Sequence, residues 1–395
     1  MNHGWENKKL GEVCSYQRGL TYSKEDESEL SDNIVLRANN IDLASNSLVL
    51  DEFKYLHPSF EISSKYKLVK DSILICMSSG SKQHLGKVAF IDSDMDLAFG
   101  GFMGLIKPII NAKFLFLYLT SNAFRKHLFR LTNGININNL KFSTLQDIAL
   151  PVPNENIQQE IVAELDKINE IIEANRALLG ELDSLAQSLF YDTFGDPITN
   201  PKGWQIYHFG DLATSINYGT SSPSKEGGRY VYLRMNNLTD NGYLDYSDLK
   251  YIDVSEEDFV KYSVEKGDIL FNRTNSREKV GKTALFQEEH PMIIAGYIIR
   301  VRVNKELLNP VFAVRLMNMP ETKGYLRKIC RGAVNQANIN SKEMAAIPFL
   351  LPPLELQKQF ASQVEAIERQ KADIEATIAE LQTLLDSRMD YWFND

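Results

Sequence analysis

"DIALPVPNENIQQEI" (Asp147–Ile161) and "AAIPFLLPPLELQKQF" (Ala345–Phe360) follow the same plan in two distant parts of the chain. Each moves from a short apolar run through prolines into a segment that contains glutamine. Proline interrupts regular structure because it lacks an N–H donor and fixes φ. Asn154 or Asn156 can cap a helix after the first stretch, whereas the second offers Pro352-Pro353 and no such capping side chain. Each stretch therefore predicts a joint at which a compact domain ends and a helix begins.

The joint is one of several blocks that occur twice in the same order. The offset between the two members of a pair drifts only between about 195 and 201 residues, as in a duplicated chain. The paired blocks are His3–Val13 with Lys202–Leu212, Val35–Ile41 with Tyr232–Leu238, Lys70–Ile75 with Lys266–Phe271, Leu85–Phe90 with Val280–Phe286, and Gly134–Leu145 with Gly332–Met344. We interpret the chain as a tandem duplication.

Within each copy the pattern is mostly that of β-strands. Apolar runs such as 72–77, 268–272 and 296–303 are bounded by Gly, Asn and Asp, which favour turns. Helices are expected at 112–129 and 309–319, each after an Asn or Asn-Pro start. The sequence therefore predicts an α/β fold of the mixed α+β type, with one domain of about 150 residues in each copy.

Two acidic segments show a different period. From Ile161 to Leu189 and from Phe360 to Leu385, apolar residues step by four and three, which is typical of a coiled coil. Each seam has one polar residue near its middle, Asn175 and Lys371. Placing these two opposite each other in an antiparallel pair aligns the apolar residues along the rest of the seam. We predict an antiparallel coiled coil with this register; separate surface helices are the alternative.

Composition restricts the class of protein. A chain of 395 residues exceeds the size at which one core keeps growing, so two or more domains are expected. No apolar run approaches the roughly 18–20 residues that cross a bilayer, and the first residues lack the apolar core of a signal peptide. The three cysteines show no spacing typical of disulfide pairs or of metal sites. This favours reduced thiols, as are found in cytoplasmic proteins. We expect a cytoplasmic protein without a membrane partner.

No catalytic constellation stands out. "VGKT" (Val280–Thr283) resembles the end of a phosphate-binding loop, but Ser276 stands where that motif needs glycine, and the first copy has "LGKV" at the matching place. We expect a structural turn there. The six histidines are scattered without ligand spacing. The sequence therefore predicts a chain with no catalytic residue, no metal and no cofactor of its own.

Positive residues indicate a DNA-binding surface. The net charge of −9 arises in segments 155–196 and 354–395, so the two larger blocks are near neutral and can bind phosphate locally. Arg and Lys beside short polar side chains suit phosphate contacts and base-edge readout, although Arg37 and Arg234, at matching places, fit a structural salt bridge equally well. The predicted DNA-binding set is Arg18, Tyr22, Lys24, Arg37, Ser79 and Lys82 in the first copy, and Tyr218, Thr220, Lys225, Arg234, Arg273, Asn275, Arg277 and Lys279 in the second.

The whole pattern resembles the specificity subunit of type I restriction–modification systems. The features that carry the resemblance are the Gly-Trp domain starts, the joints with Gln158-Gln159 and Gln357-Lys358-Gln359, and the segment Ser188–Trp204 between the copies. It implies two target recognition domains, each followed by a spacer helix. The implied boundaries are 1–153 and 197–353 for the domains, and 154–196 and 354–395 for the helices.

The resemblance also implies partners. In that family each domain reads one half of a split double-stranded DNA site, and the helices set the spacing and dock two methyltransferase subunits. The subunit itself is not catalytic: methyltransferase subunits use S-adenosylmethionine, and restriction subunits use ATP and Mg²⁺. A duplicated chain with an antiparallel helix pair imitates a two-fold symmetric dimer on two half-sites. Because the loops of the two copies differ, the site should be asymmetric.

Two other classes of function stay open on the sequence alone. One is a DNA-binding assembly scaffold without sequence preference, which salt-insensitive and unselective binding would favour. The other is an enzyme with an unrecognised nuclease or methyltransferase site. Activity of the purified chain, lost on a single carboxylate substitution, would favour that second alternative.

Overall fold

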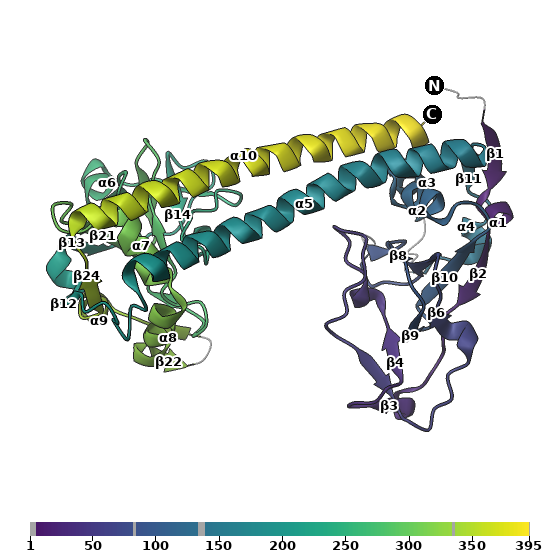
Figure 1. The fold of residues 1–395 in the computed structure, drawn as a ribbon, viewed down its shortest axis with the longest axis horizontal. Helices are drawn as coiled ribbons and strands as arrows, with labels where there is room; N and C mark the ends of the chain where they lie inside the picture. Colours follow the sequence, from purple (N-terminus) through teal and green to yellow (C-terminus); the bar gives the residue numbers. More distant parts are fainter. Residues whose placement is uncertain (1–4, 82–83, 133–138, 334–335, 395) are drawn as a thin grey trace. The chain divides into compact units, whose positions relative to one another are not determined.

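The computed structural model describes residues 5–81, 84–132, 139–333 and 336–394. The chain divides into two compact units: unit 1 comprises Met1–Arg176 and Glu375–Asp395, and unit 2 comprises Ala177–Ile374. Each unit contains one copy of the repeat together with part of each of two long helices (Figure 1). The boundary between the units therefore lies inside the helices rather than at the joints.

The two long helices are uninterrupted. They are α5 (Glu155–Phe194) and α10 (Leu354–Phe393), each of 40 residues and therefore about 60 Å long. In unit 1, the first half of α5 packs against the second half of α10. There the guanidinium of Arg388 pairs with Glu164, and the indole N–H of Trp392 donates to the same carboxylate at 3.1 Å.

In unit 2 the second half of α5 packs against the first half of α10. Leu182 and Ala186 of α5 form a small buried cluster with Ile367 of α10. Both units thus pair α5 and α10 in opposite directions, which confirms the predicted antiparallel pair. The apolar seam positions are buried or half-buried, as the heptad pattern predicts.

The polar residues of the seam make different contacts from the predicted one. Lys371 is buried, and its ammonium pairs with Asp183 at 2.6 Å, about two helical turns further along α5 than Asn175. The amide of Asn175 instead donates to the carbonyl of Ile171 in its own helix at 2.8 Å. A carboxylate satisfies a buried ammonium better than a neutral amide does. Lys371 therefore pairs by charge, and Asn175 is not its partner.

The described residues of unit 1 form three sheets. Their strand orders are β2-β10-β7-β8, β3-β5-β4-β9-β6 and β1-β11. All neighbours are antiparallel except β4 and β9, which are parallel. The strands are β1 (Glu6–Lys9), β2 (Cys14–Arg18), β3 (Glu27–Ser28), β4 (Ile34–Leu36), β5 (Lys54–Leu56), β6 (Lys67–Leu68), β7 (Ser72–Cys76), β8 (Val88–Ile91), β9 (Met95–Phe99), β10 (Met103–Pro108) and β11 (Ala149–Val152).

In unit 2, the part of the chain that the structure describes forms four sheets. Their strand orders are β13-β21-β17-β19, β15-β14-β20-β16, β12-β24 and β18-β23-β22. The strands are β12 (Gln205–His208), β13 (Ala213–Tyr218), β14 (Tyr230–Leu233), β15 (Lys250–Ile252), β16 (Ser263–Val264), β17 (Ile269–Asn272), β18 (Thr274–Asn275), β19 (Thr283–Leu285), β20 (Met292–Ile294), β21 (Ile298–Val303), β22 (Arg331–Ala333), β23 (Gln336–Asn338) and β24 (Pro348–Leu351).

The two units share one topology. The sheet β2-β10-β7-β8 of unit 1 corresponds to β13-β21-β17-β19 of unit 2, and the parallel pair β4-β9 corresponds to β14-β20. In both units the first strand of the copy pairs with the strand that leads into the joint, as β1-β11 and as β12-β24. The repeated blocks of the sequence are therefore repeated elements of structure, and the joint is part of each domain's own sheet.

Helices cover the core side of each four-stranded sheet. The expected single helix at 112–129 is two helices, because the Ser121 hydroxyl donates to the carbonyl of Tyr118 at 2.6 Å and accepts from the N–H of Phe124. Unit 2 has the same pair of helices. The helices other than α5 and α10 are α1 (Leu10–Val13), α2 (Ala112–Thr120), α3 (Asn122–Thr132) and α4 (Phe142–Leu145) in unit 1, and α6 (Glu256–Tyr262), α7 (Pro310–Asn318), α8 (Pro320–Ile329) and α9 (Ser341–Ala345) in unit 2.

The first joint is held by a buried glutamine. The amide N–H of Gln158 donates to the carbonyl of Pro153 at 2.8 Å, and its oxygen accepts from the backbone N–H of Asn111 at 3.1 Å. Asn111 is itself the N-cap of α2. Asn154 caps α5 by accepting from the N–H of Ile157 at 3.1 Å. The start of the long helix is therefore bonded both to the proline joint and to the start of α2.

The second joint repeats this arrangement without a capping side chain on α10. Gln357 is fully buried; its amide donates to the carbonyls of Pro352 at 2.7 Å and of Leu307 at 3.1 Å. Its oxygen accepts from the N–H of Asn309, the N-cap of α7, at 2.8 Å. The glutamine that the sequence repeats is thus the residue that attaches each long helix to its domain.

Several expectations from composition can be compared with the structure. No helix in the described ranges is both long and apolar enough to cross a membrane. Cys14, Cys76 and Cys330 are buried and form no disulfide. Burial raises the pKa of the Cys14 thiol to about 12, so this residue packs as a neutral apolar side chain.

Replacing Gln357 with alanine should destabilise unit 2. The substitution removes three hydrogen bonds and leaves the buried N–H of Asn309 without an acceptor, which costs about 3 kcal/mol. Urea unfolding should show a lower midpoint. Gln359→Ala is the matched control, because this neighbouring glutamine is exposed. Equal midpoints for the two variants would contradict the assigned role of the joint.

Candidate nucleic-acid interface

A hollow of about 520 Å³ in unit 1 gathers three of the predicted residues. It lies beside the turn between β9 and β10, and its lining includes Arg18, Tyr22, Arg37 and Phe102. Arg18 is the last residue of β2, and Arg37 directly follows β4. Two neighbouring sheets therefore each place one arginine in the same hollow. From the sequence alone these arginines belong to separate loops, and their proximity could not be predicted.

The charge of this hollow is positive. The side chains of Arg18 and Arg37 are exposed, and no acidic group among the described residues forms an ion pair with either. The other basic residue of the lining, Lys54, is paired with Glu27. Burial raises the pKa of Tyr22, so its hydroxyl stays a neutral donor and acceptor. Two unpaired guanidinium groups and a phenol suit a phosphate-bearing ligand.

A corresponding hollow of about 430 Å³ lies in unit 2, beside the turn between β20 and β21. Its lining includes Thr220, Arg234, Arg273 and Tyr297. The guanidinium of Arg273 lies over the ring of Tyr218, 4.9 Å from its centre. The same group donates to the carbonyl of Gly296 at 3.4 Å and to the side chain of Asn338 at 3.2 Å. Stacking and hydrogen bonds therefore hold this arginine in one orientation.

One arginine of each hollow lies at the end of a different strand in the two units. In unit 1 Arg18 ends β2, and Met77 directly follows β7. In unit 2 the residue that ends β13 is Tyr218, and the residue that directly follows β17 is Arg273. Besides Arg37 and Arg234, which occupy matching places, each hollow thus has a second guanidinium whose position in the repeat has changed.

Some predicted residues have roles within the fold. Arg234 pairs with Asp248 at 2.7 Å, so the salt bridge that the sequence allowed is present there. Lys225 pairs with Asp253. Thr220 is buried, its hydroxyl donates to Ser222, and its backbone N–H and carbonyl are bonded to Ile294 and Gly296. The side chains of these three residues therefore already have polar partners within the fold, and their contact with DNA stays a prediction.

The remaining predicted residues lie outside the hollows. Lys24, Arg277 and Lys279 are exposed, and the guanidinium of Arg277 donates to the carbonyl of Arg327 at 3.2 Å. The side-chain oxygens of Ser79 and Asn275 accept from backbone N–H groups of their own loops. Lys82 lies outside the described residues.

The Gly-Lys blocks are structural turns, as the sequence predicts. Gly86 and Gly281 have φ of +75° and +83°, and a Cβ on Gly281 would lie 2.5 Å from Leu326. The lysines that follow hold the next loops in place: Lys87 donates to the carbonyl of Ile41 at 2.6 Å, and Lys282 pairs with Asp240 at 3.0 Å. Neither block has the free backbone cradle of a phosphate-binding loop. The described residues contain no group of three or more His, Cys, Asp or Glu placed to hold a metal.

Sequence reasoning missed the exposed aromatic residue of each hollow. Phe102 and Tyr297 line the two hollows at matching places in the turns that precede β10 and β21. Both follow glycine, in "GGFMG" and "AGYII". That glycine–aromatic pair, repeated after equivalent strands, is the signal that could have identified them.

One family matches both copies of the repeat. Its description is "Type I restriction modification DNA specificity domain", and the matches cover residues 2–184 and 201–383. The chain belongs to this family. The sequence-based resemblance is confirmed, and the two matched segments each contain one copy of the repeat and most of the long helix that follows it.

Relatives of the same family align over most of the chain. The specificity subunit of the type I restriction enzyme EcoKI from Escherichia coli K12 is 25% identical over 385 residues, which cover 92% of this chain and 82% of that protein. The StySPI specificity subunit from Salmonella potsdam is 26% identical over 384 residues, with the same coverage.

Solved structures share the fold. A chain from a structural study of the assembly and conformational transition of a type I R-M system aligns with a TM-score of 0.59 and 18% identity, covering 98% of this chain and 96% of its own. The S subunit of the type I system from M. genitalium aligns with a TM-score of 0.54 and 14% identity, covering 99% and 96%. At these identities the likeness concerns the fold alone.

Arg37→Gln should weaken DNA binding and reduce its dependence on salt. The free guanidinium of Arg37 is placed for one phosphate contact, whose loss lowers the slope of log affinity against log salt by about 0.9. Binding measured at several salt concentrations checks this. Arg125→Gln on α3 removes the same charge away from the hollow and should leave the slope unchanged. Arg234→Gln should have a smaller effect than Arg37→Gln because Arg234 is already paired; the reverse order would contradict these assignments.

Proposed function

We propose that this chain is the DNA-reading subunit of a type I restriction–modification complex, with one half-site read by each unit. The observation that carries the proposal is the repeated hollow: in a protein of the DNA specificity family, both units place arginine and an aromatic side chain around the same turn. Arginine positions a protein on phosphates and reads guanine, and side chains at base edges supply specificity.

The two half-sites should differ. Phe102 of the unit 1 hollow corresponds to Tyr297 of the unit 2 hollow. Arg18, at the end of β2, corresponds to Tyr218, which lies under Arg273, and Arg273 itself has Met77 as its counterpart. Different donors and apolar groups meet different base edges. The proposed target is therefore a split DNA sequence with unequal halves.

The long helices are proposed to set the distance between the half-sites. Both α5 and α10 continue from one unit into the other without a break (Figure 1). A continuous helix is a stiff spacer whose length grows by about 1.5 Å per residue. The gap in the DNA site should therefore follow the number of residues in the helices.

The chemistry is proposed to come from partner subunits. Two methyltransferase subunits would supply adenine methylation with S-adenosylmethionine, and restriction subunits would supply cleavage with ATP and Mg²⁺. The chain itself would bind DNA weakly when alone, because its recognition domains are near neutral and few phosphates are neutralised. Tighter binding by the assembled complex than by the isolated chain is the corresponding expectation.

Mapping of methylated adenines tests the function. The chain is expressed with its methyltransferase subunits in a host that lacks other modification, and methylated positions are located across the genome. A single split sequence with unequal halves is the expected result. Methylation without a common sequence would overturn the proposal and favour an assembly scaffold. Methylation that persists when the methyltransferase subunits are omitted would overturn the non-catalytic role.

Inserting one heptad into both helices should widen the gap in the methylated sequence. Seven residues placed after Arg176 in α5 and after Ile374 in α10 add about 10 Å, or about three base pairs at 3.4 Å per base pair. The same mapping experiment measures the gap. The insertion in α5 alone is the control, because it shifts the apolar seam and should reduce the yield of assembled complex. An unchanged gap with both insertions would exclude the spacer role.

A further inference from the structure

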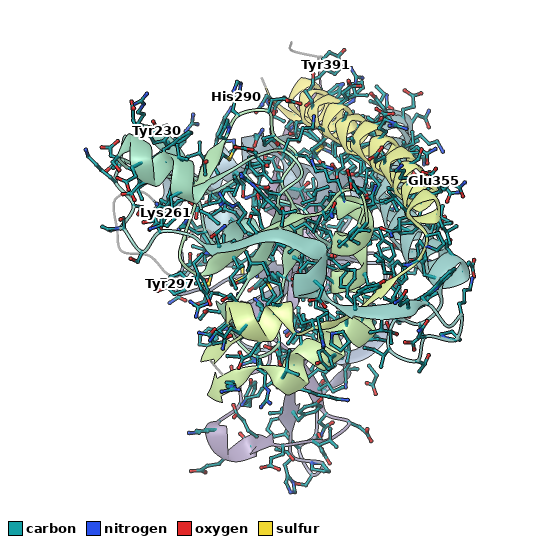
Figure 2. All side chains as sticks on the ribbon, turned by 90° about the vertical axis from the view of Figure 1, so that its left-hand side faces the viewer. Tyr230, Lys261, His290, Tyr297, Glu355 and Tyr391 are labelled. Carbon is teal, nitrogen blue, oxygen red and sulfur yellow. The ribbon has the colours of Figure 1, made fainter. Side chains whose placement is uncertain are left out.

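Each hollow has an exposed aromatic ring at its rim. The side chain of Phe102 is 70% exposed and that of Tyr297 is 53% exposed. Figure 2 shows Tyr297 at the margin of unit 2. Single exposed apolar residues are common on protein surfaces. These two differ from the rest because they occupy the same turn in both copies and lie beside the same kind of hollow.

The turn that carries Phe102 is held rigidly. The N–H of Met103 donates to the carbonyl of Gly100 at 2.8 Å, which closes a β-turn with Phe102 as its third residue. The carbonyl of Phe102 accepts from the N–H groups of Met77 at 2.9 Å and Ser78 at 3.1 Å. The backbone is therefore bonded on both sides while the ring projects from the surface, so that binding would order little more than its two side-chain torsions.

The turn that carries Tyr297 has the same construction. The N–H of Ile298 donates to the carbonyl of Ala295 at 2.8 Å, and the carbonyl of Tyr297 accepts from the N–H of Arg273 at 3.0 Å. Gly296 donates to the carbonyl of Thr220 at 2.7 Å. Arg273 thus contributes its backbone to the turn and its guanidinium to the hollow, which fixes the distance between the positive charge and the ring.

The glycine that directly follows β2 in unit 1 and β13 in unit 2 makes this approach possible. A Cβ on Gly19 would lie 2.0 Å from the carbonyl oxygen of Gly100, and one on Gly219 would lie 2.2 Å from that of Ile294. No other residue fits at these contacts without moving the backbone. The close packing brings the ends of β2 and β13, with Arg18 and Tyr218, next to the turns.

The charges around the rings match one partner, duplex DNA. Arg18 and Arg37 line the hollow beside Phe102, and Arg273 and Arg234 line the one beside Tyr297. Phosphates flank a groove whose floor consists of base edges, so guanidinium groups that contact phosphates bring an exposed ring of the same hollow near the bases. The major groove is wide enough for a two-stranded ribbon, and its one apolar group is the methyl of thymine.

We propose that Phe102 and Tyr297 are base-contacting residues, one for each half-site, whose rings pack against base edges in the major groove. This inference rests on the proposed function. Phe102 has no polar atom in its side chain, so it selects by apolar contact alone. Tyr297 adds a hydroxyl that can donate to a base acceptor, which makes the second half-site more restrictive at that base pair.

Half-site-specific loss of affinity tests this assignment. The chain is assembled with its methyltransferase subunits and bound to a duplex with the mapped site, and to duplexes with the first or the second half scrambled. Phe102→Ala should lower affinity for the full site about tenfold or more, which corresponds to the loss of one base contact. It should have no effect on the duplex whose first half is scrambled. Tyr297→Ala should show the same pattern for the second half.

Conservative and control variants complete the test. Phe102→Tyr and Tyr297→Phe keep the ring and should retain most of the affinity for the full site. Ile109→Ala and Val260→Ala remove side chains that are 74% and 76% exposed outside the hollows, and should bind like the wild type. Thermal unfolding of each variant shows whether it is folded. We expect the alanine variants to fold, because the rings of Phe102 and Tyr297 are exposed.

The outcomes separate this inference from the function on which it rests. If the wild type prefers the mapped site but both alanine variants bind it within twofold of the wild type, the assignment of the rings is wrong. A loss that is equal on intact and scrambled half-sites would also overturn it, because the rings would then contact no specific base. If the wild type itself binds all duplexes equally, the proposed function fails.

Discussion

A buried side-chain amide at each joint is the interaction on which the architecture depends. Gln158 and Gln357 each bond a proline-joint carbonyl and the N–H of an N-cap asparagine at once. A primary amide carries its donor and its acceptor on separate atoms of one planar terminal group, so it can bond both partners at the same time. Because both partners are backbone atoms, the start of the long helix is fixed relative to α2 or α7 rather than merely packed against it. The hydrogen bonds of the joint therefore fix the direction in which α5 leaves the domain of unit 1 and α10 leaves that of unit 2.

Much of this fold could be predicted because it follows from local rules. Repeated blocks, heptad periodicity and proline joints depend on neighbours in sequence, and each is present in the structure. The pairing of Lys371 with Asp183 could not be predicted in this way, because it depends on which charges meet across two helices. The break at Ser121 and the exposure of Phe102 also depend on contacts between elements. Of the predicted interface, Arg18, Tyr22 and Arg37 line the hollow of unit 1, and Thr220, Arg234 and Arg273 line that of unit 2. Lys225 lies outside the hollows and pairs with Asp253.

The hollows show how two copies of one domain can diverge without losing their electrostatics. An arginine at the end of β2 in unit 1 is replaced in unit 2 by one that follows β17, and a tyrosine occupies the vacated place and supports the new guanidinium. When the two copies are aligned, they differ at the residue that ends β2 or β13 and at the residue that follows β7 or β17. In space, each hollow still contains a guanidinium beside the same turn. Comparison of the copies by sequence therefore underestimates how similar their surfaces are.

The division of the chain has a consequence for its synthesis. Unit 2 is one continuous stretch, Ala177–Ile374, but unit 1 also needs residues from Glu375 onward. Phe393, near the end of α10, is buried against Phe114 and Tyr118, with ring centres 5.5 and 5.9 Å apart. The ribosome therefore releases all of unit 2 before it delivers the last aromatic residue that the core of unit 1 requires. The domain that is translated first is the one that is completed last, and its unfinished core must wait while the other folds.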